Sequence, residues 1–199
     1  NTVTGNTCNN NSNGIRLSSS SNSTVTGNTC NNNDNGISLY SSSNNTVIGN
    51  TCNNNSDYGI SLYSSSSDNT VIGNTCNNND YGISLDSSSN NTVTGNTCNN
   101  NYYGIFLYSS SNNNTVTGNT CNNNGGDSIY LYSSSNNNIT GNTCIRGTGQ
   151  PSDYTSSQYT IHLSGSGNSY NLISSNNCMG KDVVIGGGTS NTSVNNKYN

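Results

Sequence analysis

The chain has 199 residues but contains no Ala, no Glu and no Trp, and only one Pro, one Met, one Phe and one His. Strong helix formers are therefore scarce, and no window shows apolar residues at the i, i+3, i+4 spacing of a helix. These absences exclude a helical fold. No apolar run approaches the length of a membrane-spanning helix, so we expect no membrane insertion.

Charge is also scarce. Charged residues make up 6% of the chain, and the net charge of −4 comes from eight acidic and four basic residues. Without a basic surface, nucleic acid is not an expected partner. The hydrophobic content of 27% is low enough for disorder, but disordered chains are usually highly charged. The strict repetition described next favours an ordered repeat fold instead.

One repeated stretch fills most of the chain, and it is clearest as TVTGNTCNNNDNGISLYSSSNN at 24–45. Its GNTC marker spaces the cysteines by 22, 22, 24, 22, 23 and 23 residues, and a degenerate copy follows after 34. A fixed period of this size indicates stacked structural repeats. Within each copy, apolar residues such as Ile37 and Leu39 alternate with polar ones, as in a strand with one buried face.

We therefore predict an all-β fold in which each repeat forms one coil of a β-solenoid of about eight coils. The single domain would contain regular coils at 1–144, a protruding loop at 145–160 and degenerate coils at 161–199. Other repeat folds fit less well, because the hexapeptides of left-handed β-helices, the Ca²⁺-binding GGxGxD motif and the additional Leu of leucine-rich repeats are missing.

In-register stacking would place identical residues in ladders, and an inward Asn can bond the same Asn in the coils above and below. The predicted Asn ladder consists of Asn6, Asn28, Asn50, Asn74, Asn96, Asn119, Asn142 and Asn176. The predicted Cys ladder consists of Cys8, Cys30, Cys52, Cys76, Cys98, Cys121, Cys144 and Cys178. Buried thiols are favoured there, because parallel Cβ vectors suit disulfides poorly, but disulfides between neighbouring coils stay open. A uniform column does not offer the tetrahedral cluster that zinc requires.

Tyrosines recur at outward positions of the coils. They could stabilise the strands by cross-strand contacts, or form a flat face for another solenoid or for sugar rings. The candidate lateral interface consists of Tyr40, Tyr63, Tyr108, Tyr132, Tyr154 and Tyr159.

Catalytic groups are difficult to find. Asp34 and Asp80 share a slot two coils apart, with Ser56 between them and Asp57 nearby, which is a thin candidate for a Ca²⁺ site or a carboxylate pair. Arg16 and Arg146 lie far apart, and we expect His162 to be a solvated surface residue. We predict no catalytic residues, no metal site and no cofactor, and hence no enzyme.

The pattern NNTVxGNxxxNNxxGIxLxxSSNN resembles the right-handed parallel β-helix repeats of the NosD-like and carbohydrate-binding or sugar-hydrolase families. The resemblance covers 1–144 strongly and 161–194 weakly, and it implies a right-handed coil. The NosD-like resemblance also implies copper handling, but one His, one Met (Met179) and inward cysteines supply no evident site. The Asn, Ser and Thr content and the Cys in every coil also resemble the amyloid-like sheath protein of filamentous methanogenic archaea.

Two functions follow as expectations. The first is a structural protein of the cell envelope that assembles with itself into an extracellular sheath, layer or fibre. Its uncapped first and last strands, near 1–8 and 191–197, would pair end to end. The alternative is an extracellular protein that binds or cleaves carbohydrate. We also expect a mature product whose leader was removed, because the sequence starts inside a repeat.

Overall fold

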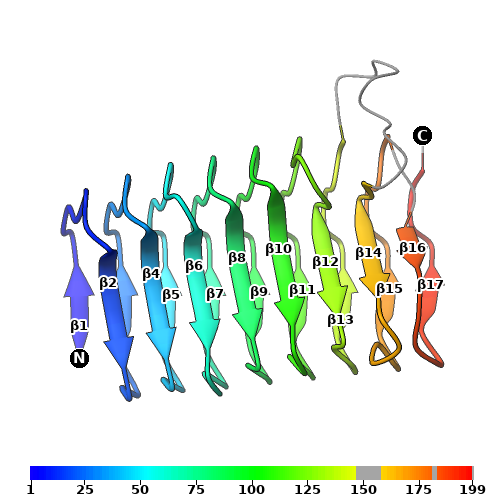
Figure 1. Cartoon of the computed structure of the whole chain (residues 1–199), viewed down its shortest axis with the longest axis horizontal. Coiled ribbons are helices and arrows are strands. Elements are labelled where there is room, and N and C mark those ends of the chain that lie inside the picture. Colours follow the sequence, from blue (N-terminus) through cyan, green and yellow to red (C-terminus); the bar gives the residue numbers. More distant parts are fainter. Residues whose placement is uncertain (147–157, 181–182, 199) are drawn as a thin grey trace.

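The computed structural model of the chain describes residues 1–146, 158–180 and 183–198. These residues form 17 strands, which stack along one axis with the two termini at opposite ends (Figure 1). In this part of the chain no helix has the length and apolar character needed to cross a membrane. Most of the predicted loop at 145–160 lies outside the described residues.

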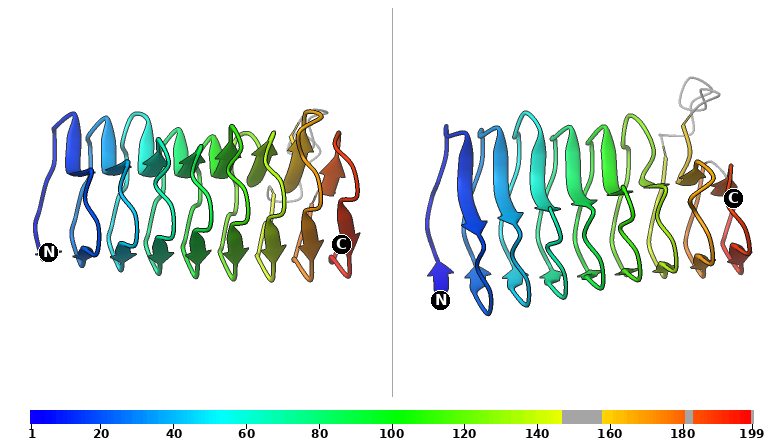
Figure 2. Two further views of the ribbon diagram at one scale, coloured as in Figure 1. Left: turned by 90° about the horizontal axis from the view of Figure 1, so that it is seen from below. Right: turned by 60° about the horizontal axis from the view of Figure 1, so that its bottom comes forward.

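The strands form two parallel sheets that run the length of the molecule as separate layers (Figure 2). The nine-stranded sheet contains β1 (Thr2–Thr4), β3 (Thr24–Thr26), β5 (Thr46–Ile48), β7 (Thr70–Ile72), β9 (Thr92–Thr94), β11 (Thr115–Thr117), β13 (Asn138–Thr140), β15 (Leu172–Ser174) and β17 (Thr192–Val194). The eight-stranded sheet contains β2 (Asn13–Ser18), β4 (Asn35–Tyr40), β6 (Tyr58–Tyr63), β8 (Tyr81–Asp86), β10 (Tyr103–Tyr108), β12 (Ile129–Tyr132), β14 (Ile161–Ser164) and β16 (Val183–Ile185).

Each strand pairs with the same strand of the next coil, so equivalent residues lie side by side. Val25 pairs with Val3 and Val47, and Ile37 pairs with Ile15 and Ile60. A third line of single bridges runs from Thr7 to Lys197 along the remaining side of the coils. The prediction of an all-β parallel solenoid of about eight coils is confirmed.

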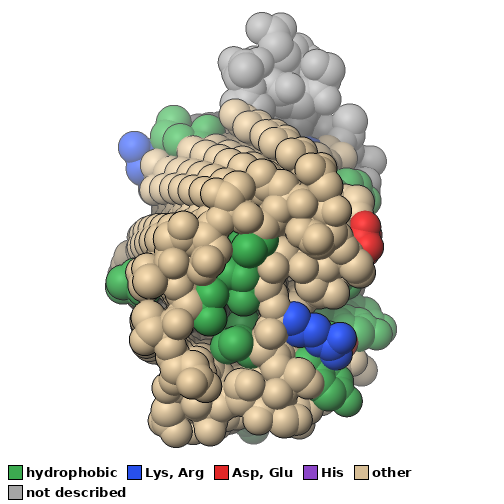
Figure 3. Space-filling model, turned by 90° about the vertical axis from the view of Figure 1, so that its left-hand side faces the viewer, with side chains coloured by type: hydrophobic (Ala, Val, Ile, Leu, Met, Phe, Trp, Pro, Cys, Tyr) green, Lys and Arg blue, Asp and Glu red, His purple; other side chains and the backbone are tan. Residues whose placement is uncertain are grey.

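The interior is thin and repetitive. Val25, Cys30, Ile37 and Leu39 of one coil are fully buried, as are their equivalents in the following coils as far as Cys178. Viewed from the N-terminal end, hydrophobic side chains lie in the centre and polar groups surround them (Figure 3). The Cys ladder is confirmed with all eight cysteines as free thiols, seven of them buried and Cys8 partly exposed at the end.

The Asn ladder is also confirmed. The backbone N–H of Asn50 and its side-chain amide both donate to Oδ1 of Asn74, at 2.9 Å each. The same side-chain amide donates to the backbone oxygen of Val25 at 3.0 Å. Each Asn therefore satisfies buried groups in the coils on both sides, where an unmet group would cost about 1–3 kcal/mol.

Three further Asn ladders were not predicted. In one, the N–H of Asn33 donates to Asn55 Oδ1, and that of Asn55 donates to Asn79 Oδ1. In a second, Asn45 donates to Asn69 in the same way. In the third, the N–H of Asn53 donates to Oδ1 of Asn31 in the preceding coil. The sequence carried the signal, because these Asn residues recur at fixed offsets from GNTC. It was masked because almost every neighbouring residue is also Asn or Ser.

The bends depend on Asn and Gly. Asn32 and Asn54 adopt positive φ values of 56° at equivalent bends, a region that Asn tolerates better than most residues. Gly59 is required for a different reason, because a Cβ there would lie 2.5 Å from the oxygen of Gly82. These two residue types let the backbone turn without strain and pack closely between coils.

At the C-terminal end, the inward slot of the last strand departs from the repeat pattern. The inward slot of β17 is occupied by Ser193, which pairs with Ile173. Val194 pairs with Ser174 and is exposed. The last strand therefore lacks an inward Val, whereas Val3 occupies that slot in the first strand.

Candidate functional site

The outer face of the eight-stranded sheet is the part of the molecule where the repeats differ most. The strand register places its outward side chains in three columns. The leading column consists of Asn13, Asn35, Tyr58, Tyr81, Tyr103, Asp127 and Tyr159. The middle column consists of Arg16, Ser38, Ser61, Ser84, Phe106, Tyr130 and His162. The trailing column consists of Ser18, Tyr40, Tyr63, Asp86, Tyr108, Tyr132 and Ser164.

Over β4, β6 and β8 the middle column is made of small serines, and a groove of about 250 Å³ results. We call it the serine groove; its lining residues are Asn35, Ser38, Tyr58, Ser61, Leu62, Tyr63, Ser84 and Asp86. Tyr58 and Tyr63 stand on opposite sides, one from each outer column. The Oγ atoms of Ser38 and Ser61 lie 3.1 Å apart and share a hydrogen bond. The groove therefore combines aromatic walls with a hydroxyl floor.

Over β10, β12 and β14 the middle column is filled by rings. We call Tyr103, Phe106, Tyr130 and His162 the aromatic ridge. Phe106 stacks on Tyr130 with ring centroids 5.2 Å apart, and Tyr130 stacks on His162 at 5.0 Å. Tyr103 of the leading column stacks on both Phe106 and Tyr130. Tyr81 lies 5.5 Å from Phe106 and so joins the ridge to the wall of the groove.

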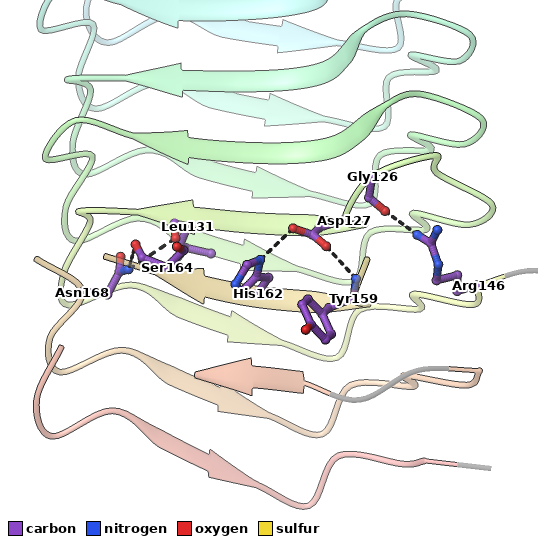
Figure 4. Close-up of polar contacts among 8 residues, drawn as sticks. All are labelled: Gly126, Asp127, Leu131, Arg146, Tyr159, His162, Ser164 and Asn168. Carbon is purple, nitrogen blue, oxygen red and sulfur yellow. Dashed lines mark hydrogen bonds and ion pairs between the residues drawn. The ribbon is translucent and has the colours of Figure 1, made fainter. Parts of the chain in front are cut away.

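His162 is not the solvated surface residue that we expected. Its Nδ1 lies 2.8 Å from Oδ2 of Asp127, and its side chain is only 20% exposed (Figure 4). Oδ1 of Asp127 accepts a hydrogen bond from the backbone N–H of Tyr159 at 2.6 Å. A carboxylate held at Nδ1 favours the tautomer with its proton on that atom, which leaves Nε2 as a proton acceptor. The pair thus has the arrangement of an oriented acid–base group.

Arg146 stabilises this region from a buried position. It donates to the backbone oxygens of Asn124 at 2.9 Å and Gly126 (Figure 4). It also donates to Oε1 of Gln158. Arg146 therefore fixes the segment that precedes Asp127 to the segment that precedes Tyr159.

Three carboxylates directly precede residues of the leading column, one more than predicted. Backbone hydrogen bonds place Asp57, not Ser56, between Asp34 and Asp80. Ser56 is the inserted residue, and counting back from the Gly-Ile of each repeat would have found this register. Burial, and then the neighbouring Asp57, raise the pKa of Asp80. Among the described residues, no group of three His, Cys, Asp or Glu side chains could hold a metal ion, so these carboxylates do not converge on one point.

The predicted tyrosine interface divides between columns. Tyr40, Tyr63, Tyr108 and Tyr132 share the trailing column, while Tyr159 belongs to the leading column beside His162. Tyr154 lies outside the described residues. Whether the trailing column contacts another solenoid stays a prediction.

Comparison with known proteins identifies the family. The profile of the family described as periplasmic copper-binding protein (NosD) matches residues 1–123 and 63–199, which together cover the chain. No curated protein matches the sequence.

Several solved structures share the fold. The A-module of the mannuronan C-5 epimerase AlgE4 of Azotobacter vinelandii has a TM-score of 0.80 at 17% identity, covering 100% of this chain and 57% of that module. The periplasmic alginate epimerase AlgG has a TM-score of 0.67 at 21% identity, covering 93% of this chain and 47% of its own. The alginate lyase of Paenibacillus sp. str. FPU-7 has a TM-score of 0.70 at 14% identity, covering 96% and 78%. The chain thus spans about half the length of the epimerases that it resembles.

These likenesses correct one prediction. The expectation that the chain is not an enzyme rested on the absence of a catalytic cluster in the sequence. It is contradicted by the solved structures of this fold, which are epimerases and a lyase.

The copper suggested by the family's description does not fit the donors of this chain. Copper requires several imidazole, thiolate or thioether groups around one point. The thiols from Cys30 onward are buried in the core, and the one imidazole already holds Asp127. The fold and the profile match nevertheless agree: the chain belongs to the NosD family of right-handed parallel β-helix proteins.

Proposed function

We propose that the chain is a carbohydrate-active protein of the cell envelope, which binds a polysaccharide along the outer face of its eight-stranded sheet. One observation carries the proposal: rings stack without interruption from Tyr58 through Tyr81, Phe106 and Tyr130 to His162. This line runs along the axis of the solenoid and passes beside the serine groove.

The chemistry of this face suits sugars. Aromatic rings stack on the apolar faces of pyranose rings, while hydroxyl and amide groups bond to the sugar hydroxyls. The floor of the groove offers the hydroxyls of Ser38, Ser61 and Ser84, and Asn35 adds an amide. Neighbouring strands lie about 4.8 Å apart, close to the rise of one sugar in an extended chain. In a polysaccharide that lies along the axis, each successive sugar would therefore face the same strand position of the next coil.

The His162–Asp127 pair lies at the far end of this line. Its Nε2 could take a proton from, or return one to, a sugar that crosses the ridge, while Asp127 stabilises the charged imidazole. The enzymes of the same fold support this assignment by analogy. The periplasmic description of the family and of AlgG supports a location in the envelope.

The sheath function has less support. It was inferred from the uncapped end strands and from the resemblance to a sheath protein, and none of the matched structures named above is a sheath protein. These matched proteins, which share the fold, act on carbohydrate. End-to-end assembly therefore stays a prediction.

Binding can be tested by calorimetry with hexasaccharides of neutral, amino and uronic acid sugars. Phe106→Ala removes the centre of the ridge and should weaken binding about three- to tenfold, the effect of losing one aromatic contact. Tyr170→Ala is the matched control, because Tyr170 is 63% exposed but precedes β15 on the other sheet. If no hexasaccharide binds, or if both variants behave alike, the proposal is wrong.

Chemistry can be separated from binding with His162→Gln, which keeps a polar side chain but removes the titratable imidazole. We expect the variant to bind the same glycan while any change in that glycan, followed by NMR, is lost. Turnover that persists at an unchanged rate would rule out His162 as the acid–base group.

A further inference from the structure

The serine groove lies in an acidic part of the surface. Asp86 is one of its lining residues, and Asp57 and Asp80 occupy the slots directly before Tyr58 and Tyr81. Both Asp57 and Asp80 are exposed. Burial first, and then Asp57, Asp86 and Asp80, raise the pKa of the Tyr58 hydroxyl, as expected when carboxylates lie within electrostatic range of it.

No cation in the described part of the chain balances these carboxylates. Between described residues, the one ion pair joins His162 to Asp127, at the other end of the face. Arg16 lies over the ring of Tyr40, 5.7 Å from its centroid, and pairs with Ser38, so it stands at the N-terminal end of the groove. Arg146 is buried and bonded to backbone oxygens. An anionic polymer would therefore meet repulsion from the carboxylates at the Asp86 end of the groove, three coils away from Arg16.

The groove also contains a polar group without a partner. Ser84 is 5% exposed, and within the described residues its hydroxyl makes no hydrogen bond, whereas those of Ser38 and Ser61 bond to each other. A nearly buried hydroxyl that lines a groove and lacks a protein partner is suited to bond a ligand. It lies one residue from Leu85 and two from Asp86, on the same strand.

We infer that the serine groove binds a glycan of amino sugars with free, protonated amines, and that it rejects polyuronates. Carboxylates attract the ammonium group, and the rings of Tyr58 and Tyr63 add cation–π attraction on each side. This inference rests on the proposed function and specifies its substrate class. It sets the chain apart from the matched epimerases and lyase, whose names refer to mannuronan and alginate.

The test compares three probes on the whole chain by calorimetry at low salt: a glucosamine hexamer, its N-acetylated form and a mannuronate hexamer. We expect the glucosamine hexamer to bind about tenfold more tightly than the N-acetylated one, the size of one charge-assisted hydrogen bond, and the mannuronate hexamer to bind weakest. Asp86→Asn should remove most of that preference. Asp68→Asn, the same change at an exposed bend outside the groove, should leave it intact.

The outcomes separate the two claims. If the mannuronate or N-acetylated hexamer binds as tightly as the glucosamine hexamer, the inference is wrong while the proposed function stands. If the glucosamine preference survives Asp86→Asn and Asp80→Asn together, the amine binds elsewhere and the inference is also wrong. If none of the three binds, the proposed function itself fails for these glycans.

Discussion

The two halves of the outer face share one backbone but present different surfaces. Over β4, β6 and β8 the middle column is Ser38, Ser61 and Ser84, and a groove forms. Over β10, β12 and β14 the same column is Phe106, Tyr130 and His162, and a ridge forms. The residues below both halves are the same buried Ile and Leu. The interior ladders fix the backbone, so the outward slots are free to vary.

The interior common to both halves should be the most sensitive to change. In Asn96→Leu, the N–H of Asn74 loses its acceptor and the oxygen of Val71 loses a donor, while the side-chain amide of Asn74 keeps its bond to Val47. At about 1–3 kcal/mol for each unmet buried group, the loss of stability should reach about 2–6 kcal/mol in chemical denaturation. Asn6→Leu is the control, because Asn6 is the exposed end of the same ladder and should cost far less. Equal costs would show that the ladder is solvated.

Single substitutions can give each half the middle-column residue of the other half. Ser84→Phe places the ring of the ridge in the floor of the groove, since Ser84 and Phe106 are paired residues. We expect glycan affinity to fall about tenfold or more, because the hydroxyl and the space are both lost. Phe106→Ser makes the reverse change and should lengthen the groove. Calorimetry measures the affinities, and unchanged melting temperatures would show that the backbone tolerates both. Unaltered affinity in Ser84→Phe would mean that the groove is not the binding site.

The smallest expected difference concerns the thiols below the two halves. Cys52 lies in the coil of the groove and Cys121 in that of the ridge, and both are fully buried. They should resist alkylation equally in the folded protein, while Cys8, which is partly exposed, should react first. Mass spectrometry of peptides after brief labelling would measure this order. Faster labelling of Cys121 than of Cys52 would show that the ridge half opens more readily.

The candidate site was much harder to predict than the fold. Periodicity shows where inward Val, Ile and Leu recur, but counting from one cysteine to the next misplaces every residue that follows an insertion. Ser56 shifted the apparent slot of Asp57, and Gly125–Gly126 hid the place of Asp127 in the column of Tyr103. Counting back two residues from Ile129 to Asp127, and from Ile161 to Tyr159, would have found both positions. His162 lies in a degenerate repeat, and its partner Asp127 lies 35 residues away, so the repeat pattern does not bring the two together.

The sequence by itself determined the parallel solenoid, the Cys ladder and the Asn ladder. In a stacked fold, residues one period apart become neighbours, so the repeat alone implies those contacts. Only the tertiary structure decided that Asp127 holds His162, that Arg146 is buried against backbone oxygens and that three serines become the floor of a groove. These depend on how each insertion is absorbed at a bend and on the sizes of side chains in adjacent coils. A period cannot specify either, because both arise where the repeats differ.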